Sequence, residues 1–365
     1  MKSCIGLIVL IFPFHVLASV EADSLVRIYD DGETYVASPH LRVKSTIAKD
    51  SVEIGAGYAM DIVTSSSCDV RSWSSTGKIA DTRREESADL GLNLQNGSFS
   101  AGYVQSDEND YHSKAFSAGM TRDFFEKNTT LDLGFSFGDD HVQSSKDSNL
   151  DQIMQNESMS LGLTQVLSPV SVIQLLYDFR IEKGFLNGPY RVARLLQDNG
   201  TVIGLPENTP LSRGRNSLAL KYNYYLKGVG ISFANTLRGY TDSWGVTSQT
   251  YEGRLSKGFG NSFSLTLNFR YYNQTAAGFY QDKYNLSSMG PYYTGNKTLS
   301  QYYTALVGLR PTVRLFKVIE LYGKYEYYIE KFQNFTDVGN PLDAGDDKLY
   351  SITAQVIGVG LTGKF

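Results

Sequence analysis

The histidines and their acidic neighbours are the side chains with the clearest potential for catalysis or metal binding. Asp139, Asp140 and His141 are consecutive, and His112 lies two residues after Asp110. A carboxylate beside an imidazole can activate water or bind a metal ion. Consecutive residues of a strand or loop do not converge on one point, however. We therefore interpret both groups as parts of solvated loops.

Other chemical signatures are absent from the sequence. It has no glycine-rich phosphate loop, no paired-cysteine metal motif and no Gly-x-Ser-x-Gly elbow. The 34 lysines and arginines are balanced by 38 aspartates and glutamates, which gives no electrostatic footprint for nucleic acid. We expect no catalytic residue, cofactor, metal or nucleic-acid partner.

Most of the remaining charged residues belong to segments in which large apolar residues recur at every second position. Leu131, Leu133, Phe135 and Phe137 alternate with polar or small residues, as in a strand with one apolar face. The same alternation recurs many times, including residues 90–94, 173–181, 263–271 and 319–329. The positioning elements are therefore β-strands.

The connections between these strands alternate between short and long. The short ones are turns at Lys49-Asp50, Asn96-Gly97, Ser168-Pro169, Lys227-Gly228 and residues 258–261. The long ones are polar loops near residues 65–82, 106–111, 139–156, 183–213, 242–247, 275–298 and 332–347. Outer-membrane barrels have short periplasmic turns and longer extracellular loops.

This pattern predicts an all-β fold, a transmembrane antiparallel β-barrel of about 16 strands (14 to 16). An extra strand from about Ser24 to Asp30 leads through Asp31-Gly32 into the strand that begins near Glu33. The composition fits, since only 41% of the 365 residues are apolar, and a barrel in lipid needs apolar residues on one face only. After the N-terminus, no apolar run is long enough for a membrane helix.

The N-terminus has the features of an export signal. Lys2 is followed by an apolar stretch from Ile5 to Leu17 and by small-residue patterns that end at Ala18 or Ala22. We expect residues 1–22 to be a cleaved signal peptide and residues 23–365 to form one barrel domain in a bacterial outer membrane. A single membrane anchor is the alternative. Cys68 would be the lone cysteine of the mature chain, so no internal disulfide can form.

The C-terminal segment is the most specific local signal. Ile357, Val359 and Leu361 alternate with small residues, and the chain ends on Phe365. This resembles the terminal strand that the outer-membrane assembly machinery recognises. Gly360, Leu361 and Phe365 form the expected assembly signal, whereas Gly363 stands where a large apolar residue is usual.

The alternation also predicts which charged residues face the interior. A charge on the lipid face costs about 2–4 kcal/mol at the bilayer midplane, which favours inward positions. The lumen-lining candidates are Arg42, Lys44, Glu53, Asp61, Asp132, Asp178, Arg180, Lys221, Arg238, Arg254, Arg270, Arg310, Glu320, Lys324 and Glu326. They either line a water-filled channel or form a plug of ion pairs. The mixture of signs predicts no strong ion preference.

The long loop at residues 183–213 offers a possible constriction. If it folds into the lumen, Tyr190, Arg191 and Arg194 would make a basic narrowing. Otherwise these are ordinary surface side chains.

Six stretches of the sequence resemble the uncharacterised outer-membrane barrel proteins grouped as domain-of-unknown-function family 3570. They are Asp30 to Pro39, Asp107 to Ser113, Leu161 to Pro169, Gly188 to Val192, Gly239 to Gly245 and Arg270 to Tyr280. The resemblance implies a barrel of the Gram-negative envelope and no established activity. Asp61 to Cys68 departs from the family's small-residue motif.

Three functions remain open. The first is a porin-like channel for small solutes or a substrate-selective transport pore. The second is a structural barrel with a plugged lumen that anchors an envelope complex for redox chemistry or export. The third, and least favoured, is an outer-membrane hydrolase. The expected partners are outer-membrane lipid and lipopolysaccharide, the assembly machinery, and either further copies of the chain or an envelope complex.

Overall fold

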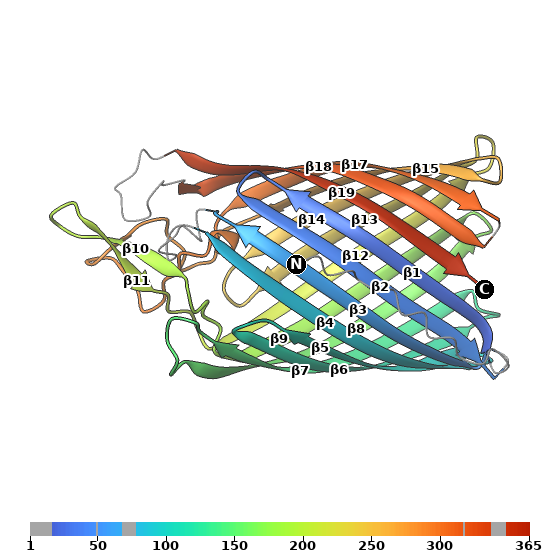
Figure 1. The fold of residues 1–365 in the computed structure, drawn as a ribbon, viewed down its shortest axis with the longest axis horizontal. Helices are drawn as coiled ribbons and strands as arrows, with labels where there is room; N and C mark the ends of the chain where they lie inside the picture. The colour runs from blue at the N-terminus through green and yellow to red at the C-terminus, as the bar shows by residue number, and fades with distance from the viewer. Residues whose placement is uncertain (1–16, 49, 68–77, 317, 337–347) are drawn as a thin grey trace, which may run out of the picture.

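Sixteen long antiparallel strands close into one barrel (Figure 1). The structure, a computed structural model, describes residues 17–48, 50–67, 78–316, 318–336 and 348–365. Residues 1–16 of the expected signal peptide and Cys68 lie outside the described residues. The all-β barrel of about 16 strands that the alternation predicts is confirmed.

The strands of the wall follow one another in chain order around the barrel. They are β1 (Leu17–Asp30), β2 (Thr34–Ile47), β3 (Val52–Ser65), β4 (Ile79–Leu94), β5 (Gly97–Asp107), β6 (Tyr111–Phe124), β7 (Thr129–Gln143), β8 (Asp151–Ser168), β9 (Ser171–Gly184), β12 (Ser212–Leu226), β13 (Ile231–Asp242), β14 (Thr247–Phe259), β15 (Phe263–Gln274), β17 (Tyr302–Leu315), β18 (Ile319–Thr336) and β19 (Leu349–Lys364). The strand predicted near Ser24 to Asp30 is therefore present and begins earlier, at Leu17.

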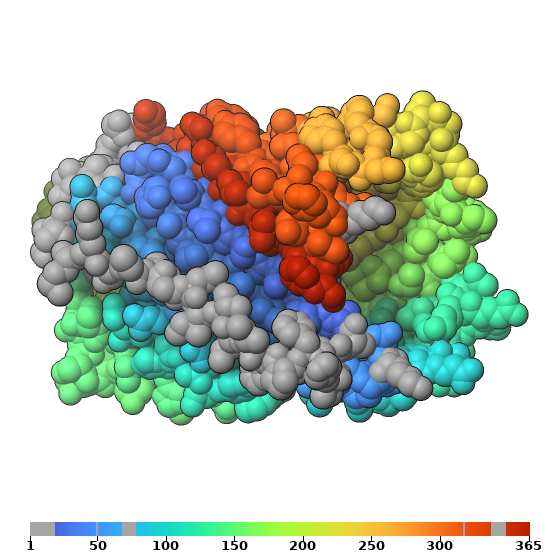
Figure 2. Space-filling view, turned by 45° about the vertical axis from the view of Figure 1, so that its right-hand side comes forward, coloured from blue at the N-terminus to red at the C-terminus, as the bar shows by residue number. Residues whose placement is uncertain are grey.

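The two ends of the chain close the barrel. β19 pairs with β1, and the two strands lie side by side in Figures 1 and 2. Val20 and Phe365 exchange two backbone hydrogen bonds of 2.8 Å at the end of this seam. Closure leaves no unpaired strand edge, which is what a spanning sheet in lipid requires.

The strand registers fix which residues share a face of the sheet. Large apolar residues such as Leu131, Phe135 and Leu237 lie on one face and are exposed, Leu237 at 56%. The opposite face carries buried side chains such as Ala219, Asp242 and Ala354, so it faces the interior. Among the described residues, no helix is long and apolar enough to cross a bilayer.

Several predicted loops are shorter than expected or contain structure of their own. β7 runs to Gln143 and β8 starts at Asp151, because polar pairs such as Gln155 with Asp139 continue the ladder. β18 continues to Thr336. The loops at 183–213 and 275–298 contain β10 (Val192–Leu196), β11 (Val202–Pro206), β16 (Tyr284–Asn285) and the 3-10 helix η1 (Lys297–Leu299).

Candidate functional site

All fifteen predicted lumen-lining residues lie on the inward face of the wall. The paired registers place each of them on the side that carries Asp242 and Ala354. The set is Arg42, Lys44, Glu53, Asp61, Asp132, Asp178, Arg180, Lys221, Arg238, Arg254, Arg270, Arg310, Glu320, Lys324 and Glu326.

Many of these inward charges form ion pairs along the wall. Arg42 Nη2 lies 2.7 Å from Asp89 Oδ1, and Lys324 Nζ lies 2.8 Å from Glu326 Oε2. Lys44 pairs with Glu53. Two partners were missed from the sequence: Arg83 pairs with Asp61 at 2.9 Å, and Arg314 pairs with Glu320 at 2.6 Å. Their positions in the alternation would have revealed both.

The two signs of charge gather on different sides of the lumen. One wall carries the inward basic residues Arg213, Arg215, Lys221, Arg238, Arg254, Arg270, Arg310 and Arg314, with Asp242 and Glu252 among them. The other wall, β3 to β7, carries the inward acidic residues Glu53, Asp61, Asp81, Glu85, Asp89, Asp132 and Asp140, with Arg83 among them. In the ring of sixteen strands, β13 and β14 stand opposite β3 and β4. The lumen is therefore polarised rather than evenly mixed.

A packed apolar core, which the sequence did not predict, lies where the long loops meet one end of the barrel. Trp244, Val246, Ala277, Tyr280 and Leu299 pack there against inward residues of β18 and β19. We call this assembly, formed by residues 243–246, 275–301 and 185–211 with the strand ends they contact, the cap. Its three segments connect β9 to β12, β13 to β14 and β15 to β17, and its core packs against β18 and β19.

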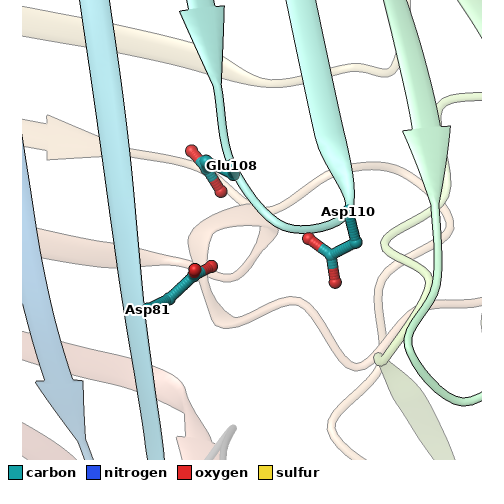
Figure 3. Close-up of side chains that lie close together, drawn as sticks. All are labelled: Asp81, Glu108 and Asp110. Atoms are coloured by element: carbon teal, nitrogen blue, oxygen red, sulfur yellow. The ribbon is translucent and has the colours of Figure 1, made fainter.

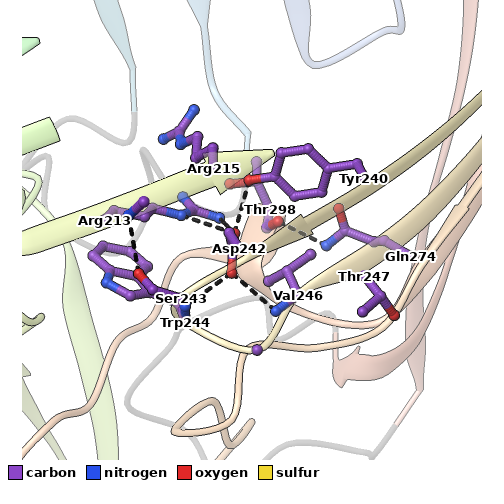
Figure 4. Close-up of polar contacts among 12 residues, drawn as sticks. Arg213, Arg215, Tyr240, Asp242, Ser243, Trp244, Val246, Thr247, Gln274 and Thr298 are labelled. Atoms are coloured by element: carbon purple, nitrogen blue, oxygen red, sulfur yellow. Dashed lines mark hydrogen bonds and ion pairs between the residues drawn. The ribbon is translucent and has the colours of Figure 1, made fainter. Parts of the chain in front are cut away.

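Asp242 organises the base of the cap (Figure 4). Its fully buried side chain accepts hydrogen bonds from Arg213, from Tyr240 Oη at 2.8 Å, and from the backbone N–H groups of Trp244 and Val246 at 2.9 and 3.0 Å. The Arg213 guanidinium lies 4.5 Å from the centre of a Trp244 ring. A buried carboxylate held by several donors fixes the turn that bears Trp244.

The loop after β15 is fastened to this turn. Gly278 N donates to Trp244 O at 2.8 Å, and Ala277 N donates to Leu299 O at 2.8 Å. Gln274 Nε2 donates to the carbonyl oxygens of Thr298 and Ser300 at 2.9 and 2.6 Å. Gly245 has a φ of +87° and lies close to Gly278, so this turn suits glycine.

The predicted constriction residues belong to the cap. Arg194 is 6% exposed and pairs with Asp282 while donating to Thr336 Oγ1 at 2.9 Å. Arg191 lies 4.0 Å from Glu207, and Tyr190 donates to Asp110. β10 and β11 lie beyond the ends of the wall strands in Figure 1. The expectation of a constriction inside the lumen is therefore corrected. Tyr190, Arg191 and Arg194 bind acidic and hydroxyl side chains of the loops at the mouth, so they hold these loops together above the lumen.

A cavity of about 470 Å³ lies beneath the Asp242 turn. It is lined on the inward face of β9, β12, β13 and β15 by five arginines. These are Arg180, Arg213, Arg215, Arg238 and Arg270. No sequence signal groups them, because they come from four strands that are neighbours only in the closed sheet.

Three carboxylates gather at the rim, in the β4 strand and the loop after β5 (Figure 3). One oxygen each of Asp81, Glu108 and Asp110 lies within 4.8 Å of the others. Burial, together with the charges of Asp81 and Asp110, raises the pKa of Glu108. Carboxylate oxygens suit hard cations, but Asp81 accepts a hydrogen bond from Asn109 and Asp110 accepts one from Tyr190, so the group also braces the rim.

The acid–histidine group of β7 does not form a site. Asp140 lies on the inward face and is buried, whereas Asp139 and His141 lie on the outward face. His141 Nδ1 is 3.6 Å from Asp151 Oδ1 on β8. The alternation of the strand separates the groups that catalysis would need together.

The comparison with protein families settles membership. The model described as "Protein of unknown function (DUF3570)" matches residues 62–350. The chain belongs to this family. Among curated proteins, no relative matches the chain.

Solved structures share the DUF3570 chain's fold at low sequence identity. A bacterial polysaccharide outer membrane secretin is 11% identical with a TM-score of 0.53, covering 96% of this chain and 99% of that one. CdiB from Acinetobacter baumannii is 9% identical with a TM-score of 0.50, and the likeness covers 95% of this chain and 60% of CdiB. OmpT of Vibrio cholerae is 9% identical with a TM-score of 0.49, covering 96% and 97%. The first two likenesses show that the chain has the fold of outer-membrane β-barrels.

Four of the stretches that carry the DUF3570 resemblance meet at the cap. Gly239 to Gly245 contains Asp242 and Trp244, and Arg270 to Tyr280 contains Gln274 and Gly278. Gly188 to Val192 reaches Asp107 to Ser113 through Tyr190 and Asp110. The motifs seen in the sequence therefore build the loops over the mouth.

Proposed function

We propose that this protein is a capped channel of the bacterial outer membrane that passes small polar solutes. The observation that carries the proposal is the division of the wall into two faces. Large apolar side chains are exposed on the outward face, and charged side chains follow the inward face over most of the barrel. The first face suits lipid and the second suits water.

The arrangement of the ion pairs favours a channel over a plug of ion pairs. Lys324 pairs with Glu326 of its own strand, Lys44 with Glu53 of the next strand, and Arg42 with Asp89 two strands away. Such pairs run along the wall and do not span the lumen. A barrel of about 16 strands is wide enough to hold an aqueous channel between such walls.

The proposal extends to targeting and partners. We propose export through a signal peptide, insertion by the assembly machinery acting on the C-terminal strand, and contact with lipid and lipopolysaccharide at the outward face. We also propose that the barrel is not an enzyme, since Asp140 and His141 lie on opposite faces of β7.

Single-channel conductance of the purified barrel in a planar bilayer tests the proposal. Folding is checked first by the shift in gel mobility on heating. We expect steady conductance from the folded protein. Silence from a folded, inserted barrel would contradict the proposal.

A structural barrel is the second candidate, because the cap ties loops from different sides of the mouth. Tyr190 contacts Asp110 of the β5–β6 loop and Ser145 of the β7–β8 loop, while Arg194 contacts Asp282 and Thr336. If the barrel is structural and its lumen is plugged, both the wild type and variants with loosened loops will be silent, whereas a mouth closed only by these ties would conduct once they are loosened. An envelope complex would then be sought by cross-linking at the loops.

A further inference from the structure

We infer that the cavity beneath the cap binds a small hydrophilic anion that carries a carboxylate or phosphate group. The inference rests on the proposed channel, since the anion reaches the cavity through the lumen, and it names the class of solute. At about 470 Å³ the cavity is within the size range of ligand sites.

The charges around the cavity leave an excess of guanidinium groups. Arg180 and Arg215 occupy directly opposed positions on β9 and β12 and share one carboxylate, Glu182, at 3.3 and 2.6 Å. Like charges directly opposed across two strands are destabilising. Arg238 is exposed to the cavity and has no ion-pair partner among the described residues. An anion placed between these three groups would relieve the repulsion.

The other charged groups around the cavity are committed elsewhere. Arg213 is held by Asp242, and Arg270 lies 3.3 Å from Glu252. Asp178 lines the cavity and accepts a hydrogen bond from Ser217 at 3.2 Å. Arg180, Arg215 and Arg238 therefore remain as three guanidinium groups. Only two carboxylates, those of Asp178 and Glu182, are available to balance them.

One of these arginines also has an unused donor. Arg215 Nε is buried without a hydrogen-bond partner among the described residues. A buried charged donor that makes no hydrogen bond is unfavourable, and the Arg215 side chain as a whole is 32% exposed, so part of it is accessible to an anion in the cavity. Guanidinium groups bind carboxylate and phosphate oxygens in a planar, paired geometry.

The rest of the lining mixes hydroxyl groups with apolar surface. Ser217, Ser248 and Thr250 supply hydroxyl groups, and Val246 with the rings of Tyr240 and Tyr272 supplies the apolar part. This mixed lining matches a solute that carries both hydroxyl groups and C–H faces, as a sugar ring does. The site therefore suits a sugar acid or a phosphorylated solute better than a fatty acid.

Isothermal titration of the folded barrel in detergent tests the site with inorganic phosphate, gluconate and, as the neutral comparison, glucose. We expect saturable binding of phosphate, gluconate or both, no binding of glucose, and weakening as the salt concentration rises. Binding of one anion alone identifies the phosphate or the carboxylate as the recognised group. If neither phosphate nor gluconate binds, the inference is overturned.

Two variants and a control localise the binding. Arg238→Gln, which breaks no ion pair between described residues, and the double variant Arg215→Gln with Arg238→Gln should weaken binding by tenfold or more. Arg254→Gln also removes an inward arginine but leaves the lining of the cavity intact, and should change binding less than twofold. If Arg254→Gln weakens anion binding as much as the cavity variants do, the anion is attracted by the overall charge of the lumen, and the proposed site is overturned.

The outcome is independent of the conductance test. A conducting barrel without anion binding would remove the site and leave the channel standing. Anion binding by a silent barrel would keep the site and remove the channel.

Discussion

At the scale of single residues, the alternation identified the direction of side chains but not their contacts. It placed Arg270 and Glu326 correctly on the inward face, because a period of two needs no knowledge of neighbouring strands. It could not place Arg213 against Asp242 or Arg180 opposite Arg215, because those contacts depend on register and closure. Long-range pairing is what a single sequence lacks.

The Asp242 carboxylate gives the first prediction at this scale. Asp242→Asn leaves Arg213 buried without its counter-charge, which should destabilise the cap by about 3–5 kcal/mol. We expect faster proteolysis of the loop at 275–301 while the wall remains folded. Limited digestion followed by mass spectrometry measures this.

The matched control for that variant is Asp198→Asn, an exposed acidic residue of the β10–β11 turn. It should leave the digestion rate of the 275–301 loop unchanged. If both variants digest like the wild type, Asp242 does not organise the cap.

At the scale of elements, the sequence predicted the strands well and the loops poorly. Strand ends extended past the expected bounds at Gln143 and Thr336, since polar alternation outside the lipid zone gives no apolar signal. The local hairpin of β10 and β11 was missed within the long polar loop, and β16 was missed because it pairs with β10 from a loop far away in the sequence. The core around Trp244 was missed for the same reason.

The closing seam gives a prediction about assembly. Deleting Phe365 removes the terminal aromatic residue of the expected assembly signal, directly after the end of β19. We expect less barrel in the membrane fraction and more protease-sensitive chain in the periplasm. Cell fractionation with protease digestion measures both.

Lys364→Ala serves as the control for the deletion. It changes the exposed residue next to Phe365 and keeps both Phe365 and the pairing of β19 with β1. Normal membrane levels after the Phe365 deletion would refute its role as part of the assembly signal.

The β6–β7 turn gives a prediction about stability. Phe125, Glu126 and Lys127 have φ values of +52°, +57° and +67°, a backbone region that costs non-glycine residues about 1–2 kcal/mol each. Glu126→Gly should raise the free energy of unfolding by about 1 kcal/mol, because glycine adopts this region freely. Urea titration in lipid vesicles measures the change. Glu126→Ala retains the strain, and equal stability of the two variants would contradict the prediction.

At the scale of the whole molecule, a polarised, polar interior lies beneath a packed cap. Basic residues on β12 to β17 face acidic residues on β3 to β7 across the ring. The sequence supplied the inventory of these charges, but their separation appears only once the strands are placed in order around the barrel. A field across the lumen would orient passing solutes that carry charge.

A water-filled path along the inward face of the wall is tested by the accessibility of single thiols. Thr236 is inward and Leu237 outward on β13, so each is replaced by cysteine in a Cys68→Ser background. A charged, membrane-impermeant thiol reagent is then added during single-channel recording. We predict that Thr236→Cys is modified and its conductance falls, whereas Leu237→Cys in lipid is unaffected. An unreactive Thr236→Cys, or equal modification of both positions, would contradict the account.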